Sequence, residues 1–172
     1  LHIADSRISR GMSKENILIT GAGPNGVTGR RIKEFLEKLS KYNILAPSSK
    51  ELDLTDFYKV NNYFHENEVD YVIHCAVLAP SRNHDDSDPA EEIESNLRMF
   101  LNITYHTPKI KKIFYIGSGA EFDKRDEIIN IREEDFPKNI PADKYGFTKY
   151  VLNSIAAENP KICNLRVFGT IN

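Results

Sequence analysis

The chain has 172 residues and a formal net charge of −2 at pH 7, which is enough length for one compact domain with a sizeable core. Positive and negative charges are mixed along the sequence, so nothing indicates a nucleic-acid-binding surface. No apolar stretch approaches the roughly 20 residues that a membrane-spanning helix needs. The sequence therefore indicates neither a membrane-spanning helix nor a nucleic-acid partner.

The ends of the chain and its cysteines indicate the compartment. Cys75 and Cys163 lie in apolar strand-like runs, as expected of reduced thiols in a cytoplasmic protein. Residues 1–11 have no apolar core of the signal-peptide type, and Met12 reads as a natural start. We therefore expect residues 1–11 to be a leader added in cloning and residues 12–172 to form the folded domain.

Strand-like and helix-like patterns alternate from residue 16 onward. Short apolar runs predict strands at 16–20, 42–46, 71–76, 112–116 and 162–168. Apolar stripes predict helices around 32–39 and at 56–66, 89–105 and 142–158. The inward-facing positions of these helices would be Ile32, Phe35, Leu36, Leu39, Phe57, Val60, Phe64, Ile93, Leu97, Phe100 and Leu101. Such alternation is typical of an α/β fold with a doubly wound, Rossmann-like parallel sheet of at least five strands.

A glycine-rich turn from Thr20 to Gly29 separates the first strand from the first helix. Strand, glycine turn and helix form the context that a dinucleotide-binding fingerprint requires. Glycines let the backbone approach a pyrophosphate, and the helix start offers free N–H groups and a positive dipole end. An ordinary glycine-rich loop is the less favoured alternative. The candidate cofactor-binding residues of this turn are Gly21, Gly23, Asn25, Gly26, Val27 and Gly29.

Tyr145 and Lys149 are four residues apart on a predicted helix, so they share one face about one turn apart. A free phenol has a pKa of about 10 and is a poor base at neutral pH. A nearby ammonium group favours the phenolate, so Tyr145 could move a proton to or from an alcohol or sugar oxygen. Ser118 follows the fourth strand and could hold that oxygen by a hydrogen bond. Helix packing by Tyr145 and a strand-end cap by Ser118 are the structural alternatives.

With these motifs in order, the chain resembles the extended short-chain dehydrogenase/reductases, the NAD(P)-dependent sugar epimerase/dehydratase family. Within this family, the chain most resembles the branch of dTDP-4-dehydrorhamnose reductase and GDP-fucose synthase. The matching segments are 20–29, 53–56, 72–76, 115–122, 145–149 and 164–169. Family members continue well beyond the last segment, so we expect a C-terminal substrate domain to be missing from this chain.

The resemblance implies a role for each matching residue. Tyr145 would be the acid/base, Lys149 would bind the nicotinamide ribose and tune the tyrosine, and Ser118 would bind the reacting oxygen. Asp53 and Leu54 would meet the adenine, and Ala76 and Val77 would line the path of the nucleotide. Asn96 stands where the family often has a supporting asparagine.

The sequence departs from the family pattern at three points. Read from Gly21, the glycine turn is longer than the family's usual spacing, which is recovered if the turn is read from Gly23. The other two departures narrow the chemistry. Gly119 and Ala120 replace the Asp-Glu pair of sugar 4,6-dehydratases, and Ala120 also replaces the cysteine acid/base of GDP-fucose synthases. Dehydration and double epimerisation are therefore disfavoured, which leaves a 4-keto reductase or a 4-epimerase.

The end of the second strand bears on the choice of cofactor. NAD-specific folds usually carry an Asp or Glu there to bind the ribose hydroxyls, whereas this chain has no carboxylate before Glu51. Ser48, Ser49, Lys50 and Arg30 could supply donors and charge to a 2′-phosphate, although solvated surface charges are the simpler reading of the two cations. The sequence slightly favours NADP over NAD.

The sequence thus predicts an NAD(P)-dependent nucleotide-sugar epimerase or 4-keto reductase in which Tyr145 moves the hydroxyl proton. The alternative is a dinucleotide-binding sensor or scaffold without turnover. Helices 89–105 and 142–158 pair between subunits in the family, which makes a homodimer plausible.

Three groups of polar residues have no assigned role in the predicted function. His74 lies within a strand and is expected to be a core histidine. His84 precedes Asp85 and Asp86, but no second ligand set is apparent, so no metal site is expected. Glu121 and Asp123 could touch substrate or lie in a solvated loop.

Overall fold

A computed structural model describes residues 14–78, 89–123, 125, 129–136 and 138–168. The strands are β1 (Asn16–Thr20), β2 (Asn43–Leu45), β3 (Tyr71–His74), β4 (Lys112–Ser118) and β5 (Ile162–Val167). The helices are α1 (Val27–Leu39), α2 (Phe57–Glu66), α3 (Pro89–Thr104) and α4 (Lys144–Ala157). Short 3₁₀ helices are η1 (Thr107–Lys109), η2 (Gly119–Glu121) and η3 (Glu133–Asp135).

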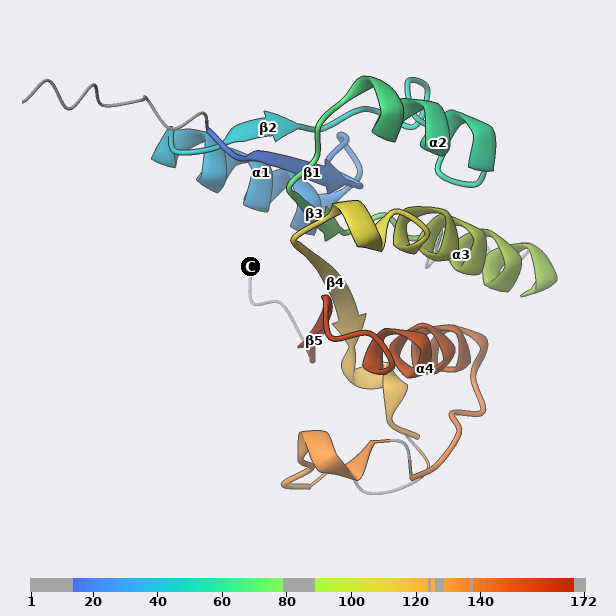
Figure 1. The fold of residues 1–172 in the computed structure, drawn as a ribbon. Helices are drawn as coiled ribbons and strands as arrows, with labels where there is room; N and C mark the ends of the chain where they lie inside the picture. Colours follow the sequence, from blue (N-terminus) through green and yellow to red (C-terminus); the bar gives the residue numbers. More distant parts are fainter. Residues whose placement is uncertain (1–13, 79–88, 124, 126–128, 137, 169–172) are drawn as a thin grey trace, which may run out of the picture.

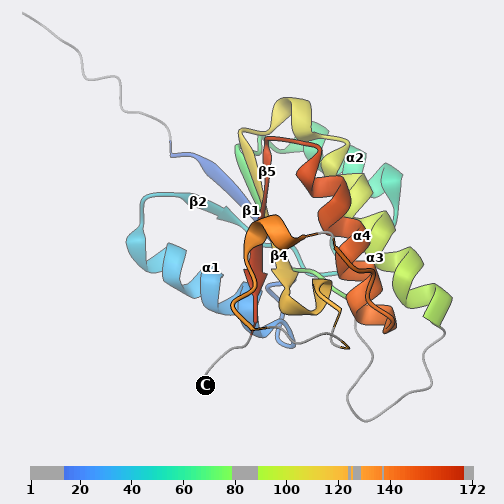
Figure 2. The same cartoon turned by 90° about the horizontal axis from the view of Figure 1, so that it is seen from below.

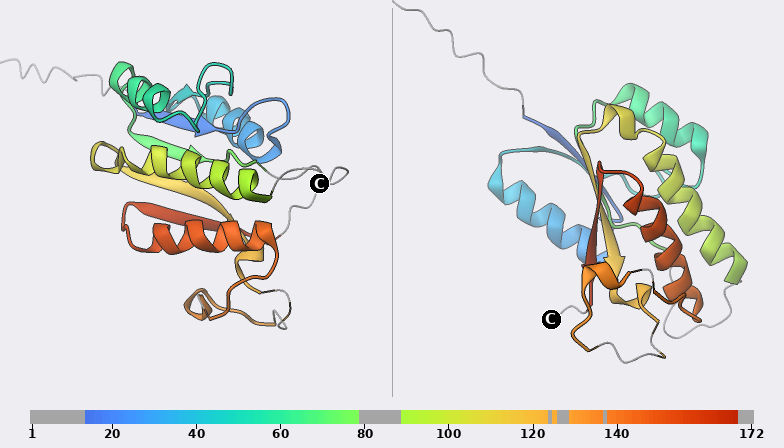
Figure 3. Two further views of the ribbon diagram at one scale, coloured as in Figure 1. Left: turned by 90° about the vertical axis from the view of Figure 1, so that its right-hand side faces the viewer. Right: turned by 60° about the horizontal axis from the view of Figure 1, so that its bottom comes forward.

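The strands form one parallel sheet in the order β2-β1-β3-β4-β5. Helices α2, α3 and α4 lie on one face of this sheet and α1 lies on the other, as Figures 1 and 2 show. The further views of Figure 3 show α3 and α4 running side by side along that face. Chain order and spatial order differ at β1, which lies between β2 and β3, so the predicted doubly wound α/β fold is confirmed.

The main core lies between the sheet and the layer of α2, α3 and α4. Leu18, Val72 and Ile113 come from three neighbouring strands and are fully buried there. Phe100 of α3 packs edge to face on Tyr115 of β4, with ring centroids 5.2 Å apart. Parallel strands that are covered on both faces read as continuous apolar runs, which is why the strand positions were recognisable in the sequence.

Some helix side chains that were predicted to be buried are exposed. Phe57 and Leu101 are 38% and 47% exposed, and Phe35 and Leu39 of α1 are 62% and 41% exposed. Phe57, the first residue of α2, instead packs edge to face on Tyr105, which directly follows α3. Helical periodicity identifies an apolar stripe, but it does not say whether another layer covers that stripe.

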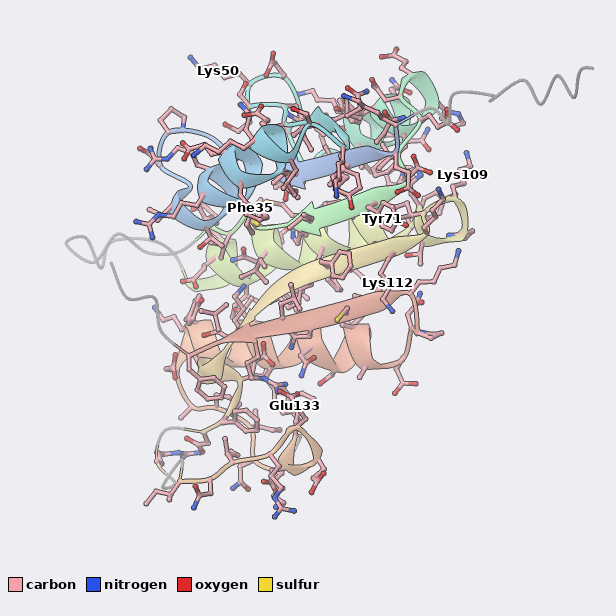
Figure 4. The ribbon with its side chains drawn as sticks, turned by 90° about the vertical axis from the view of Figure 1, so that its left-hand side faces the viewer. Phe35, Lys50, Tyr71, Lys109, Lys112 and Glu133 are labelled. Carbon is pink, nitrogen blue, oxygen red and sulfur yellow. The ribbon has the colours of Figure 1, made fainter. Side chains whose placement is uncertain are left out.

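The α1 side of the sheet carries an apolar groove of about 440 Å³. In Figure 4, which labels Phe35 on α1, no drawn helix lies in front of β3, β4 and β5. The groove is lined by Arg31, Ile32, Phe35, Leu36, Ile73, Phe114 and Leu165. Within the described part of the chain, the α1 side of β3, β4 and β5 is therefore only partly covered. No helix in that part is long and apolar enough to cross a bilayer.

Candidate active site

The glycine turn between β1 and α1 is shaped by close backbone approaches. Gly21 has a φ of +68°, and a Cβ there would lie 2.6 Å from the backbone nitrogen of Ala76. A Cβ on Gly26 would overlap the carbonyl oxygen of Gly21, whereas a Cβ on Gly23 would meet nothing within 4 Å. The structure therefore makes Gly21 the first tight glycine of the turn. The alternative register that starts at Gly23 does not describe the packing.

The turn ends at the start of α1. Gly26 donates its N–H to the carbonyl of Gly23 at 2.9 Å and then serves as the N-cap, with no side chain capping the helix. The first N–H groups of an α-helix have no partner within the helix, so they are available to an anion. Asn25 and Val27 are exposed beside them, and Arg30 donates to the carbonyl of Pro24 at 3.1 Å.

The loop after β2 brings a carboxylate to an unexpected place. The backbone N–H of Ser48 donates to Glu51 at 2.7 Å, and this bond lowers the pKa of the Glu51 carboxyl. Ser48, Ser49 and Lys50 are exposed, and Lys50 projects from this loop in Figure 4. The sequence argument for NADP assumed that no carboxylate lay at the strand end. In the fold, Glu51 turns back to that point, which weakens this argument.

Asp53 and Leu54 follow the same loop but face different surroundings. Asp53 accepts hydrogen bonds from the N–H and the hydroxyl of Thr55, at 3.0 and 2.7 Å, and these bonds lower the pKa of its carboxyl. Leu54 is buried in the core. A contact between Leu54 and an adenine would therefore have to come from its backbone.

At the end of β3, polar contacts hold the backbone that follows the strand. The Thr20 hydroxyl lies 2.9 Å from Nδ1 of His74 and accepts the N–H of Ala76 at 3.2 Å. His74 is buried, and burial lowers the pKa of its ring to about 3, so it is the neutral core histidine that was predicted. Val77 is 44% exposed beyond this point.

Asn96 of α3 supports the same segment, as the family resemblance implied. Its side-chain oxygen accepts the N–H of Leu78 at 2.9 Å, and its amide donates to the carbonyl of Leu78 at 2.7 Å. His84, Asp85 and Asp86, which were considered as metal ligands, lie outside the described residues.

Ser118 ends β4 and caps η2. Its hydroxyl oxygen accepts the N–H of Ala120 at 3.1 Å, and its own N–H donates to the carboxylate of Glu121 at 2.8 Å. Ser118 therefore forms the strand-end cap that was the structural alternative to a substrate-binding role. It uses only the acceptor side of the hydroxyl, and among the described residues no oxygen accepts the hydroxyl proton, which can therefore donate to a substrate oxygen.

Tyr145 and Lys149 both lie on α4, which begins at Lys144 because Asp143 caps it by accepting the N–H of Gly146 at 2.9 Å. The Lys149 amino nitrogen is 5.8 Å from the centre of the Tyr145 ring and 4.7 Å from that of Tyr115. It donates to the carbonyl of Ile116 at 3.0 Å. Burial lowers the pKa of this amino group to about 8, although the nearby Glu121 and Cys75 raise it.

The start of α4 lies against the turn that Ser118 caps. A Cβ on Gly146 would be 2.6 Å from the carbonyl oxygen of Ala120. Lys149 reaches β4 just before Ser118, so the three predicted catalytic residues share one end of the sheet. The glycine turn and the segment after β3 lie at the carboxyl ends of neighbouring strands, where ligands of such sheets bind.

Sequence reasoning missed the burial of Glu121 and Asp123, which are only 1% and 7% exposed. Neither is part of a solvated loop, so that alternative was wrong. Glu121 is paired with Arg166 and Asn164 of β5, and Asp123 with Arg125. The partners of Glu121 are more than forty residues away, and no local pattern in the sequence indicates them.

Comparison with known proteins places this geometry in a family. Residues 17–171 match the model described as the NAD dependent epimerase/dehydratase family. GDP-L-colitose synthase of Yersinia pseudotuberculosis is 29% identical over 110 residues, which are 63% of this chain and 35% of that protein.

Solved structures agree on the fold. The GDP-mannoheptose C4 reductase of Campylobacter jejuni, solved with NADP bound, superposes with a TM-score of 0.78 at 23% identity, over 89% of this chain and 51% of that one. A dTDP-4-dehydrorhamnose reductase of Clostridium acetobutylicum gives a TM-score of 0.66 at 28% identity, over 88% and 52%. The chain thus spans about a third of the sequence relative and about half of these structures. Because the family model matches most of its length, the chain belongs to the NAD dependent epimerase/dehydratase family.

Proposed function

We propose that this chain is the cofactor-binding and proton-transfer part of a nucleotide-sugar 4-keto reductase or 4-epimerase. The observation that carries the proposal is the arrangement at the carboxyl end of β4. There Ser118 keeps its hydroxyl proton free, and the helix that carries Tyr145 packs on the turn that Ser118 caps. A buried ammonium on the same face of that helix, Lys149, is what a tyrosine acid/base requires.

The residues fit a dinucleotide at two places. The turn around Gly21 and Gly26 brings the backbone to the uncapped start of α1, which suits a pyrophosphate. Lys149 has an ammonium with three N–H groups, of which one is donated to Ile116, so others can reach ribose hydroxyls. When bound, the nicotinamide supplies or accepts the hydride.

The chain's own share of the reaction is proton transfer and orientation. For reduction of a keto group, the Ser118 hydroxyl would donate a hydrogen bond to the keto oxygen and hold it in place. The Tyr145 hydroxyl would give its proton to that oxygen as negative charge develops on it. Lys149 would stabilise the phenolate that Tyr145 becomes. The reverse direction, which a 4-epimerase also needs, begins with Tyr145 removing the hydroxyl proton.

We propose NADP as the preferred cofactor, with NAD as the competitor. Support comes from the exposed Ser48, Ser49, Lys50 and Arg30 near the expected 2′-phosphate position, and from the NADP in the related Campylobacter jejuni structure. The carboxylate of Glu51 at Ser48 opposes this choice. We therefore propose a small difference in affinity between NADP and NAD.

The remaining expectations belong to the same proposal. Residues 12–172 would be the NAD(P)-binding domain of a cytoplasmic enzyme, with residues 1–11 an added leader that lies outside the described residues. A C-terminal substrate domain would complete the site for the nucleotide sugar. A homodimer would pair through α3 and α4.

Calorimetric titration of this chain with NADPH and NADH tests the cofactor part. Tight binding of either confirms that the glycine turn is formed, and their ratio gives the preference. The chemistry is tested on the longer protein that includes the proposed C-terminal substrate domain, by following NADPH loss with GDP- and dTDP-4-keto sugars for the wild type and Tyr145→Phe. We expect Tyr145→Phe to bind NADPH as the wild type does and to lose nearly all turnover. Cofactor binding without any turnover in that longer wild-type protein would instead favour a dinucleotide-binding sensor or scaffold.

A further inference from the structure

A buried cluster of polar side chains lies directly behind Ser118. Glu121 is at its centre, with no exposed side-chain surface, and Arg166 of β5 is only 4% exposed. The Glu121 carboxylate accepts hydrogen bonds from Arg166 Nε at 2.9 Å and from Asn164 Nδ2 at 2.9 and 3.2 Å. It also accepts the backbone N–H of Ser118 at 2.8 Å. A carboxylate is costly to bury unless it is paired in this way.

Two further observations show that the fold is built around this carboxylate. A Cβ on Gly117 would overlap both Glu121 Oε1 and Asn164 Oδ1, so the absence of a side chain at 117 makes room for the pair. The Arg166 guanidinium lies 4.7 Å from the ring centre of Phe122 and 5.6 Å from that of Phe136. These contacts hold Arg166 in place independently of its bond to Glu121.

We propose that Glu121 is a positioning residue for Ser118, which it fixes to β5 through Arg166 and Asn164. The proposal rests on the role of Ser118 in the proposed function. Glu121 holds the N–H of Ser118, and the N–H of Ala120 holds its hydroxyl oxygen. Together these bonds fix the position of the hydroxyl oxygen, from which the proton can be donated. Catalytic side chains must be held closely to their productive geometry to be effective.

The test compares two variants with a matched control. Glu121→Leu combined with Arg166→Met removes the bond to Ser118 without leaving a buried charge unpaired. Glu121→Gln keeps one acceptor oxygen for the Ser118 N–H. The control is Glu133→Gln, because Glu133 also pairs with Arg166 but is 82% exposed and belongs to η3. Figure 4 labels Glu133 on the β5 side of the molecule.

Hydrogen exchange of the Ser118 amide, followed by NMR, reads the positioning directly and needs no turnover. We expect the double variant to exchange this amide about tenfold faster or more, which is the effect of losing about 1.4 kcal/mol of protection. We expect Glu121→Gln to restore most of the protection and Glu133→Gln to behave as the wild type. If the double variant does not fold, the Ser118 amide should still exchange faster in Asn164→Ala than in Glu133→Gln.

Kinetics of nucleotide-sugar reduction, measured on the longer protein that includes the proposed substrate domain, give the second readout. The double variant should lose about tenfold in kcat, with its KM for the sugar and its Kd for NADPH changed less than about twofold. Unchanged Ser118 protection in the double variant would overturn the proposal, as would an equal loss of kcat in Glu133→Gln. If the wild-type protein with its substrate domain turns over no nucleotide sugar, the proposed function fails, and the amide exchange still decides whether Glu121 positions Ser118.

Discussion

Lys149 links the stability of the fold to the chemistry of the candidate site. Its amino group is buried, donates to the carbonyl of Ile116, and has a pKa of about 8, against 10.5 in a free side chain. Between these pH values the Lys149 amino group is protonated in the unfolded chain but largely deprotonated in the native chain. Stability from this group therefore rises with pH.

Lys149→Met tests this sign. The free energy of unfolding of the wild type relative to Lys149→Met should increase by about 1–2 kcal/mol from about pH 7.5 to about pH 9.5. Urea denaturation of both proteins across this range measures the difference. Burial raises the pKa of the Cys75 thiol to about 11 although Lys149 lowers it, so both proteins carry Cys75→Ala to remove this opposite contribution. A difference that stays flat with pH would show that Lys149 remains charged in the native state.

Glu51 gives a second prediction for a single residue. Its carboxylate lies at the N–H of Ser48, near the expected position of a 2′-phosphate, and two negative charges at a surface repel weakly. Glu51→Gln should therefore raise the preference for NADPH over NADH by about threefold, measured as the ratio of calorimetric Kd values. The control is Glu66→Gln at the end of α2. An unchanged ratio would mean that the nucleotide does not approach this loop.

At the scale of elements, the turn between β1 and α1 separates glycines with different roles. Gly26→Ala should lower stability by about 2 kcal/mol or more and weaken NADPH binding at least tenfold, because the new Cβ would overlap the Gly21 carbonyl. Gly23→Ala has open space around it and should change stability by less than about 0.5 kcal/mol. Thermal unfolding and calorimetry of the two variants measure both effects. Equal losses in the two would contradict the packing described for this turn.

The succession of elements was predictable because each strand and helix carries its own local signal. The boundaries agree to within about two residues in most cases, and the structure supplies reasons for the differences. Thus α4 begins at Lys144 because Asp143 caps it, and β4 continues to Ser118 because β5 pairs with it that far. Residues of the candidate site that belong to contiguous motifs, such as Tyr145 and Lys149, could be named from the sequence.

The partners of two carboxylates could not be predicted from the sequence. Glu121 reads as a loop carboxylate until the fold brings Arg166 and Asn164 against it. Glu51 lies several residues past the strand, yet a turn returns its carboxylate to Ser48. Tertiary structure places the charge of Glu121, whereas a local turn places that of Glu51, and hydrophobic periodicity encodes neither.

At the scale of the whole molecule, the two faces of the sheet are covered unequally. The groove beside α1 should make the chain bind an apolar dye such as ANS. Phe35→Ser should lower the dye fluorescence by about half with little change in the melting temperature, because Phe35 is 62% exposed in that groove. Tyr58→Ser is the control, since Tyr58 is 77% exposed but does not line the groove. Equal fluorescence of the two variants would show that the dye binds elsewhere.

The position of β5 at the end of the sheet has a consequence for how concentrated solutions of the chain behave. Among the described residues, β5 pairs with β4 alone, so the N–H and C=O groups along its other edge have no strand beside them. Proteins often protect such an edge with outward charges, but the Arg166 side chain of β5 is turned inward toward Glu121. The edge can therefore act as a template on which an extended segment from another polypeptide adds a sixth strand, and sheet growth of this kind increases with concentration.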